Sequence, residues 1–162
     1  MQASDAPTST FAAEDYCADT SVIRTRSRQE LLYTRSKIVN VAKAFGLHAI
    51  DMVCVNYKDV DYLKDECADG RRLGFNGKQA IHPAQVDVIH STFVPTPEEI
   101  SRAAKILHLM AQTHAAEKGA VGLDMGDEKG SKEMIDAPML KQAEQTVKAA
   151  RAAGLEIPHF AS

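Results

Sequence analysis

The chain has 162 residues, of which 44% are hydrophobic and 25% charged, with a formal net charge of −3. This composition is typical of a globular domain with a real core, and the weak negative charge argues against a nucleic-acid or anionic-membrane surface. No apolar run approaches the roughly 18 residues of a membrane span. The three cysteines form no C-x-x-C pair, which favours a reducing compartment over a disulfide scaffold.

The chain begins with small and polar residues over 1–10, where we expect no regular structure. The stretch FAAEDYCADT, residues 11–20, follows. Its adjacent acids, Glu14 and Asp15, look like the tip of a strand aimed at a metal or a substrate. A metal site needs acidic ligands from more than one such strand end.

The next segment predicts a helix followed by a buried strand. A helix is expected over 27–45, where Ser27 and Glu30 have the spacing of a capping box and Gly46 supplies a left-handed stop. The nearly continuous apolar run over 48–57 predicts a strand covered on both faces, as in parallel sheets.

Shorter elements come next. We expect Asp59 to cap a helix that ends near Leu73, followed by a turn over 74–77. A short strand is expected over 78–82, and Pro83 is suited to the first turn of another helix.

The last third of the chain is predicted to be helical. Residues 96–99 form a second capping box, which opens a helix to about Lys118. Residues 119–133 are expected to form an irregular connection, and Asp136 opens a last helix that ends near Gly154. Strands that alternate with amphipathic helices in the first part of the chain predict βαβ units and a parallel sheet.

Each candidate side chain also has a plain structural explanation. Asp15 could be a loop acid or a capping group, or it could bind a hard cation such as Mg²⁺. Asp51 lies within an apolar strand, where a carboxylate must be hydrogen-bonded, and could simply hold neighbouring elements together. His82 is more often structural than a ligand, and Asp136 before Ala-Pro is a good helix N-cap.

Five segments in this order resemble one family. They are FAAEDYCADT, ELLYTRSKIVNVAKAFGLHAIDMV, LGFNGKQAIHPAQVDVI, F-x-P-T-P-E-E-I and MIDAPMLKQAEQTV. Together they cover residues 11 to about 150 and resemble the citrate lyase β-subunit-like branch of the HpcH/HpaI aldolase superfamily.

The resemblance implies an α/β fold, the C-terminal part of a TIM (β/α)₈ barrel with extra C-terminal helices. FAAEDY matches the end of the sixth strand, HAIDMVCV the seventh and KQAIHP the eighth, and the first five strands have no counterpart. The implied organisation is an unstructured leader over 1–10, barrel sequence over 11–95 and a helical extension over 96–162.

The resemblance also implies a site. In the family, Mg²⁺ is held by an acid at the end of the fifth strand, which this sequence does not contain, and by an Asp that matches Asp15. Asp136 matches a catalytic Asp that reaches into the site of a neighbouring subunit. Gln79 and Ala80 match a segment that lines the pocket of the coenzyme A (CoA) thioester.

The implied activity is Mg²⁺-dependent, reversible cleavage of a C–C bond in short hydroxyacyl-CoA thioesters of the malyl, citramalyl or citryl type. The partners would be the CoA thioester and a 2-oxo acid, glyoxylate or pyruvate, in a homotrimer with no nucleic-acid or membrane partner. Relatives occur in bacterial cytoplasm and in mitochondria. This chain would be a C-terminal fragment, inactive alone; the alternative is a non-catalytic remnant or interaction module derived from such an enzyme.

Overall fold

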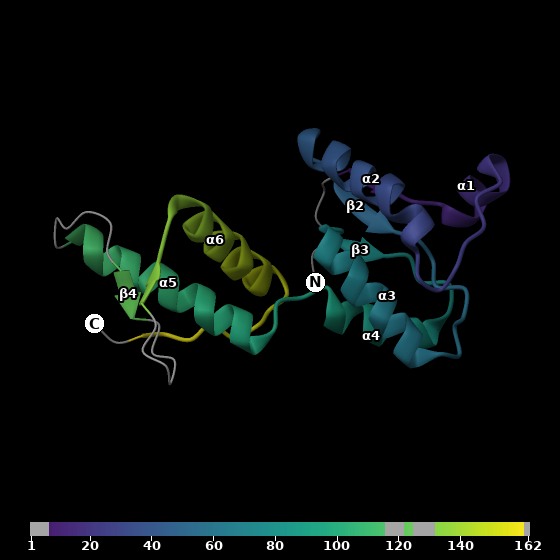
Figure 1. Ribbon diagram of the computed structural model, residues 1–162. Helices are drawn as coiled ribbons and strands as arrows, with labels where there is room; N and C mark the ends of the chain where they lie inside the picture. Colours follow the sequence, from purple (N-terminus) through teal and green to yellow (C-terminus); the bar gives the residue numbers. More distant parts are fainter. Residues whose placement is uncertain (1–6, 116–121, 125–131, 161–162) are drawn as a thin grey trace. The chain divides into compact units, whose positions relative to one another are not determined.

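The computed structural model describes residues 7–115, 122–124 and 132–160 (Figure 1). None of the helices within these residues is long and apolar enough to cross a membrane.

The chain forms two compact units, which divide between Phe93 and Val94. We expected this division between residues 95 and 96. Each unit has hydrophobic clusters of its own, so each can be understood from its own packing.

The N-terminal unit alternates strands and helices along the chain. Its elements are β1 (Thr8–Thr10), α1 (Ala13–Thr20), η1 (Gln29–Leu31), α2 (Leu32–Ala44), β2 (His48–Asp51), α3 (Val60–Leu73), β3 (Gly77–Lys78), η2 (Pro83–Gln85) and α4 (Val86–Thr92). The three strands are parallel and lie in the order β1-β2-β3. The predicted α/β class with a parallel sheet is therefore confirmed.

The two faces of this sheet differ in burial. Ala49 and Asp51 point to one face and are buried, whereas His48 and Ile50 point to the other and are only partly buried. α2 and α3 pack on the first face, where Ala49 joins a cluster with α2 and Gly70 of α3 lies against Asp51. We expected a strand covered on both faces, and the structure buries only one of them.

The sheet begins earlier than the sequence predicts. No regular structure was expected before residue 11, which is wrong for Thr8–Thr10, because these residues pair in parallel register with His48–Ile50. Threonine is β-branched and fits a strand well once a partner strand is present. Residues 1–6 of the expected leader lie outside the described residues.

β2 ends at Asp51, well before the predicted end of the strand. The carbonyl groups of Val53 and Cys54 accept hydrogen bonds from side chains and not from a neighbouring strand. Val53 O accepts a hydrogen bond from Arg24 Nη2 at 3.0 Å, and Cys54 O accepts one from Gln85 Nε2 at 2.9 Å. These bonds satisfy the backbone and let the chain leave the sheet.

β3 is also shorter than predicted, because it ends at Lys78 and does not reach residue 82. The N–H of Ile81 donates to the side-chain oxygen of Gln85 at 2.9 Å. That side chain takes the place of a strand partner, and η2 begins at Pro83 as expected.

Most helix ends follow the local signals in the sequence. Asp59 caps α3 and accepts a hydrogen bond from Tyr62 N–H at 2.9 Å. Gly46 has a φ of 68°, as predicted for a left-handed stop, and Gly74, where a turn was expected, ends α3 with a φ of 98°.

The predicted capping box at Ser27 and Glu30 is wrong. Glu30 accepts from the N–H of Thr25 at 2.6 Å, and the chain passes through Arg28 with a left-handed φ of 60°. α2 is therefore preceded by the short 3₁₀ turn η1. The hydrogen bond between Thr25 and Glu30 closes a loop that is longer than the one a capping box closes.

The C-terminal unit contains two long helices. Its elements are α5 (Pro97–Ala115), β4 (Gly122–Asp124), β5 (Lys132–Met134) and α6 (Ala137–Ala152). The capping box that opens α5 is confirmed, since Thr96 N–H donates to Glu99 Oε2 at 2.8 Å and Glu99 N–H to Thr96 Oγ1 at 3.2 Å. β4 and β5 pair antiparallel within the segment expected to be irregular, and the rest of that segment lies outside the described residues.

A buried ion pair joins the sheet to the helices on its covered face. Asp51 Oδ1 and Oδ2 accept from Arg35 Nε at 3.0 Å and Nη2 at 2.7 Å, and both side chains are at most 1% exposed. Gly70 gives this pair its room, because a Cβ at that position would lie 2.6 Å from Asp51 Oδ2.

We therefore expect Gly70→Ala to destabilise the protein by about 1–3 kcal/mol, the range typical of an overpacked core. In the interior of an open helix the same change would stabilise by up to about 1 kcal/mol, because alanine is the better helix former. Urea unfolding of both proteins measures the difference. A higher urea midpoint for Gly70→Ala than for the wild type would show that the close approach of the new Cβ to Asp51 does not destabilise the protein.

Candidate functional site at the carboxyl edge of the sheet

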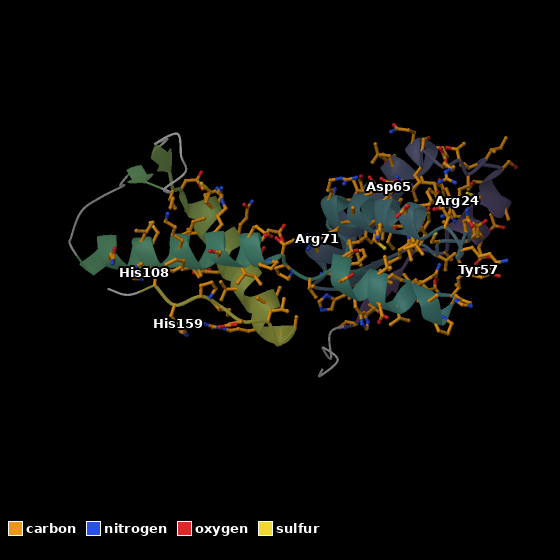
Figure 2. The ribbon with its side chains drawn as sticks, turned by 90° about the horizontal axis from the view of Figure 1, so that it is seen from below. Arg24, Tyr57, Asp65, Arg71, His108 and His159 are labelled. Atoms are coloured by element: carbon orange, nitrogen blue, oxygen red, sulfur yellow. The ribbon has the colours of Figure 1, made fainter. Side chains whose placement is uncertain are left out.

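The three parallel strands end at one edge of the sheet, and three segments leave the sheet there. They are α1 after β1, residues 52–59 after β2 and residues 79–82 after β3. Arg24 and Tyr57 lie toward the same end of the N-terminal unit as α1 (Figures 1 and 2). The carboxyl edge of a parallel sheet is the usual place for ligand-binding groups in α/β folds.

Asp15 lies at this edge, in the first turn of α1. Its side chain is exposed, and no other group in the described part of the chain bonds to its carboxylate. The expected strand tip is wrong, because the N–H of Tyr16 already donates to Ala12 O at 3.0 Å and the chain is helical. Acidic residues suit this position, since the N-terminus of a helix carries partial positive charge.

The neighbouring acid, Glu14, is not free. Its carboxylate forms an ion pair with Nη1 of Arg24. Nη2 of Arg24 donates to Glu66 Oε1 at 2.9 Å and to Val53 O at 3.0 Å. One guanidinium therefore joins α1 to the segment after β2 and to α3.

Glu66 and Lys78 extend this chain of charges into the interior. Both side chains are 0% exposed, and Lys78 Nζ lies 3.0 Å from Glu66 Oε2 and 3.9 Å from Asp51 Oδ2. Asp51 is in turn bound by Arg35, which also reaches Asp69 Oδ2 at 2.6 Å. The structural explanation of Asp51 is thus supported.

The surroundings of Glu66 and Arg24 keep both groups charged. Burial raises the pKa of the Glu66 carboxyl, but Lys78, a hydrogen bond from Tyr62 and Arg24 outweigh burial and hold it below its ordinary value. Burial opposes the charge of Arg24 as well, but Glu14 and Glu66 raise its pKa above the ordinary value. The ion pairs therefore persist over the neutral pH range.

Gln79 and Ala80 follow β3 at the same edge, and both are exposed. The structure thus brings them to the edge where Asp15 lies. The N–H of Gln79 donates to Asp51 O at 3.1 Å, which fixes the backbone at the start of this segment.

His82 makes contacts that stabilise the structure, as expected for a structural histidine. Its ring stacks on Tyr57 with the centroids 4.8 Å apart, and its Nδ1 accepts from Ala84 N–H at 3.2 Å. These contacts hold the segment after β3 against the segment after β2.

Asp136 lies in the C-terminal unit, where it caps α6. Its Oδ1 accepts from the N–H of Met139 at 2.9 Å, and the side chain is exposed. The predicted N-cap is therefore confirmed. Its Oδ2 has no bonding partner among the described residues.

Arg24 and Glu66 were missed by sequence reasoning. Arg24 sits in a polar connection that carries no pattern of its own. Glu66 could have been found, because it falls on the buried stripe of α3 with Leu63, Cys67 and Gly70, where an acid needs a cationic partner. Within the residues that the structure describes, no group of three or more His, Cys, Asp or Glu side chains could hold a metal ion.

Comparisons with known proteins point to one family. A sequence model of the family described as HpcH/HpaI aldolase/citrate lyase matches residues 7–83. The mitochondrial citramalyl-CoA lyase of Mus musculus is 39% identical over 137 residues, which are 85% of this chain and 38% of that enzyme. The citrate lyase subunit beta of Leuconostoc mesenteroides subsp. cremoris is 33% identical over 142 residues, 88% of this chain and 45% of that subunit.

A solved structure gives the same result. The chain resembles the crystal structure of CitE from Mycobacterium tuberculosis in complex with magnesium, acetoacetate and coenzyme A, with a TM-score of 0.67 and 28% identity. The superposition covers 88% of this chain and 51% of that one. The chain spans less than half the length of the two curated relatives named above.

The buried charges generate a prediction about stability. Lys78→Met should destabilise the protein by about 3–5 kcal/mol, because it removes the buried cation that faces Glu66 Oε2, while Arg24 still pairs with the other oxygen of that carboxylate. The double variant Lys78→Met/Glu66→Gln should be less destabilised than the sum of the two single variants, since the two groups interact directly.

Urea unfolding of the four proteins in this cycle measures the coupling. Lys64→Met is a matched control, because Lys64 is 61% exposed and its one ion-pair partner among the described residues is Asp61, also exposed, at 3.8 Å. Its effect should stay within about 0.5 kcal/mol. Additive effects of Lys78→Met and Glu66→Gln would contradict the ion pair.

Proposed function

Because the chain belongs to the HpcH/HpaI aldolase/citrate lyase family, in its citrate lyase β-subunit-like branch, we propose that it is the C-terminal part of a Mg²⁺-dependent carbon–carbon lyase. The substrates would be short hydroxyacyl-CoA thioesters. One observation carries this proposal: at the carboxyl edge of the sheet Asp15 is exposed and unpartnered among the described residues, whereas Glu14 is paired with Arg24.

The uneven burial of the sheet supports a larger barrel. β1, β2 and β3 would be the sixth, seventh and eighth strands of a (β/α)₈ barrel, with His48 and Ile50 toward its interior. α5 and α6 would be the extra C-terminal helices. In such barrels the reacting groups come from the carboxyl ends of the strands, the edge where Asp15 and Gln79 lie.

Asp15 suits Mg²⁺, which prefers hard carboxylate oxygens and is commonly bound through one or two carboxylates together with substrate oxygens and water. When bound, Mg²⁺ would polarise the carbonyl group of a 2-oxo acid and offset the charge that develops on its oxygen. A second acidic ligand would come from a strand that this chain does not contain, so the chain alone would be inactive.

Asp136 would exchange a proton with the methyl carbon of the CoA thioester, in the site of a neighbouring subunit of a homotrimer. Its Oδ2, which has no partner in the described part of the chain, supports this role, because the capping bond to Met139 uses only Oδ1. Gln79 and Ala80, both exposed, would line the thioester pocket.

Similarity to the relatives favours certain substrates and compartments over others. Citramalyl-CoA or malyl-CoA would be cleaved, with pyruvate or glyoxylate as the 2-oxo acid. Similarity to a mitochondrial citramalyl-CoA lyase favours citramalyl-CoA and a mitochondrial location, and similarity to bacterial citrate lyase subunits leaves citryl thioesters and the bacterial cytoplasm as the next candidates.

Turnover of citramalyl-CoA and malyl-CoA, with and without Mg²⁺, tests the proposal. We expect no turnover by this chain alone and Mg²⁺-dependent turnover once it is extended by the sequence encoded upstream of Met1. Asp15→Ala should abolish that activity, and Asp19→Ala, which removes another exposed acid of α1, should not. Activity that survives Asp15→Ala would contradict the metal role, and inactivity of the extended protein would favour a non-catalytic module.

Asp136→Asn separates the two roles of Asp136 in the active, extended protein. Asparagine caps a helix about as well as aspartate, so stability should be almost unchanged. Asparagine cannot exchange the proton, so the rate should fall by about 10²–10⁴-fold. Glu144→Gln, which removes a charge from an exposed position of α6, should leave the rate unchanged. Full activity of Asp136→Asn would leave Asp136 as a helix cap only.

Mixed trimers test whether Asp136 acts across a subunit interface. Asp15→Ala and Asp136→Asn subunits should each be inactive alone. After unfolding and joint reassembly, some sites would combine an intact Asp15 with an intact Asp136, and part of the activity should return. Mixed trimers that form and remain inactive would contradict action in the neighbouring subunit.

A further inference from the structure

α1 is held from two sides, and the two anchoring residues flank Asp15 in the sequence. Consecutive residues of an α-helix are separated by about 100° around its axis. Two anchored residues on either side of a third therefore fix the direction in which the Cα–Cβ bond of that third residue points.

The first anchor is Glu14, through its ion pair with Arg24. The side chain of Arg24 is 11% exposed and that of Glu66, its inner partner, is 0% exposed. Arg24 is itself fixed by Glu66 and by Val53 O, so Glu14 is attached to a rigid group. A charged donor shared by such acceptors makes stronger hydrogen bonds than a neutral one.

The second anchor is Tyr16. Its hydroxyl accepts from Thr34 Oγ1 at 3.1 Å, and its ring contacts Phe11 edge-on with centroids 5.7 Å apart. Tyr16 also packs on the cluster formed by Phe11, Ala13, Leu31 and Met52. α1 is otherwise weakly attached, since Ala13 is its only buried residue.

We propose that Glu14 and Arg24 are positioning residues, which fix α1 so that the Cα–Cβ bond of Asp15 points in one direction and its carboxylate is left free for a divalent cation. The inference rests on the proposed function for the role of Asp15. It assigns different tasks to the two adjacent acids, because Glu14 is used to hold the helix and only Asp15 remains available as a ligand.

Hydrogen–deuterium exchange of the full chain, read by mass spectrometry, tests the anchoring. Arg24→Gln should speed exchange in α1 by about tenfold and Glu14→Gln by about threefold, because Glu14 is half exposed and Arg24 holds several groups. Arg26→Gln is the matched control. Arg26 lies two residues away, is 69% exposed and pairs with Asp59, so exchange in α1 should not change.

α3 serves as the internal reference. Glu14→Gln leaves the bonds between Arg24 and Glu66 in place, so exchange in α3 should keep its wild-type rate. In Glu14→Gln, unchanged exchange in α1, or an increase of equal size in α1 and α3, would overturn the inference, since the second result would mean a general loss of stability.

Mn²⁺ binding by the extended protein, which would carry the second acidic ligand, tests the link to Asp15 and is read from the electron paramagnetic resonance of the free ion. The dissociation constant should rise in Glu14→Gln and Arg24→Gln and stay unchanged in Arg26→Gln. Faster exchange in α1 with unchanged Mn²⁺ affinity would overturn the positioning role. Mn²⁺ binding that Asp15→Ala leaves unaltered in the extended protein would count against the metal role of Asp15, and thus against the proposed function, whatever the exchange rates show.

Discussion

Buried charge determines how the parallel sheet and its helices fit together in the N-terminal unit. Asp51 and Glu66 are both 0% exposed, and an uncompensated carboxylate at such a depth would cost several kcal/mol. Their cations come from separate parts of the chain: Arg35 from α2, Lys78 from β3 and Arg24 from the connection before α2. Satisfying these charges therefore fixes the sheet edge, two helices and a connecting segment relative to one another.

The same set of charges gives the exposed edge of the sheet its chemistry. The ion pairs run from the interior through Glu66 and Arg24 and end at Glu14 on the surface. Asp15, one residue further along α1, takes no part in them. Two adjacent carboxylates thus differ in whether they are free to bind a ligand, and this difference follows from the ion pairs of the buried core.

Most helix ends were predictable from the sequence, and features that depend on distant partners were not. Gly46 and Asp59 determine helix ends through their own backbone or side chain, so their roles could be predicted. β1 could not, because its polar threonines form a strand only when β2 is beside them. Asp51 was recognisable as an acid in need of a partner, but Arg35 looks like an ordinary position on a helix. A metal-binding role of Asp15 was suggested by the adjacent acids of the sequence, whereas the catalytic role of Asp136 came from the family resemblance alone.

The most direct test is a crystal structure of the protein grown with millimolar Mn²⁺, in which anomalous scattering locates the metal. We predict a peak at the carboxylate of Asp15, with Glu14 still paired to Arg24. A metal bound by Glu14 with Arg24 displaced, or bound by Asp51 or Glu66 in the interior, would contradict the division of roles between the two acids of α1.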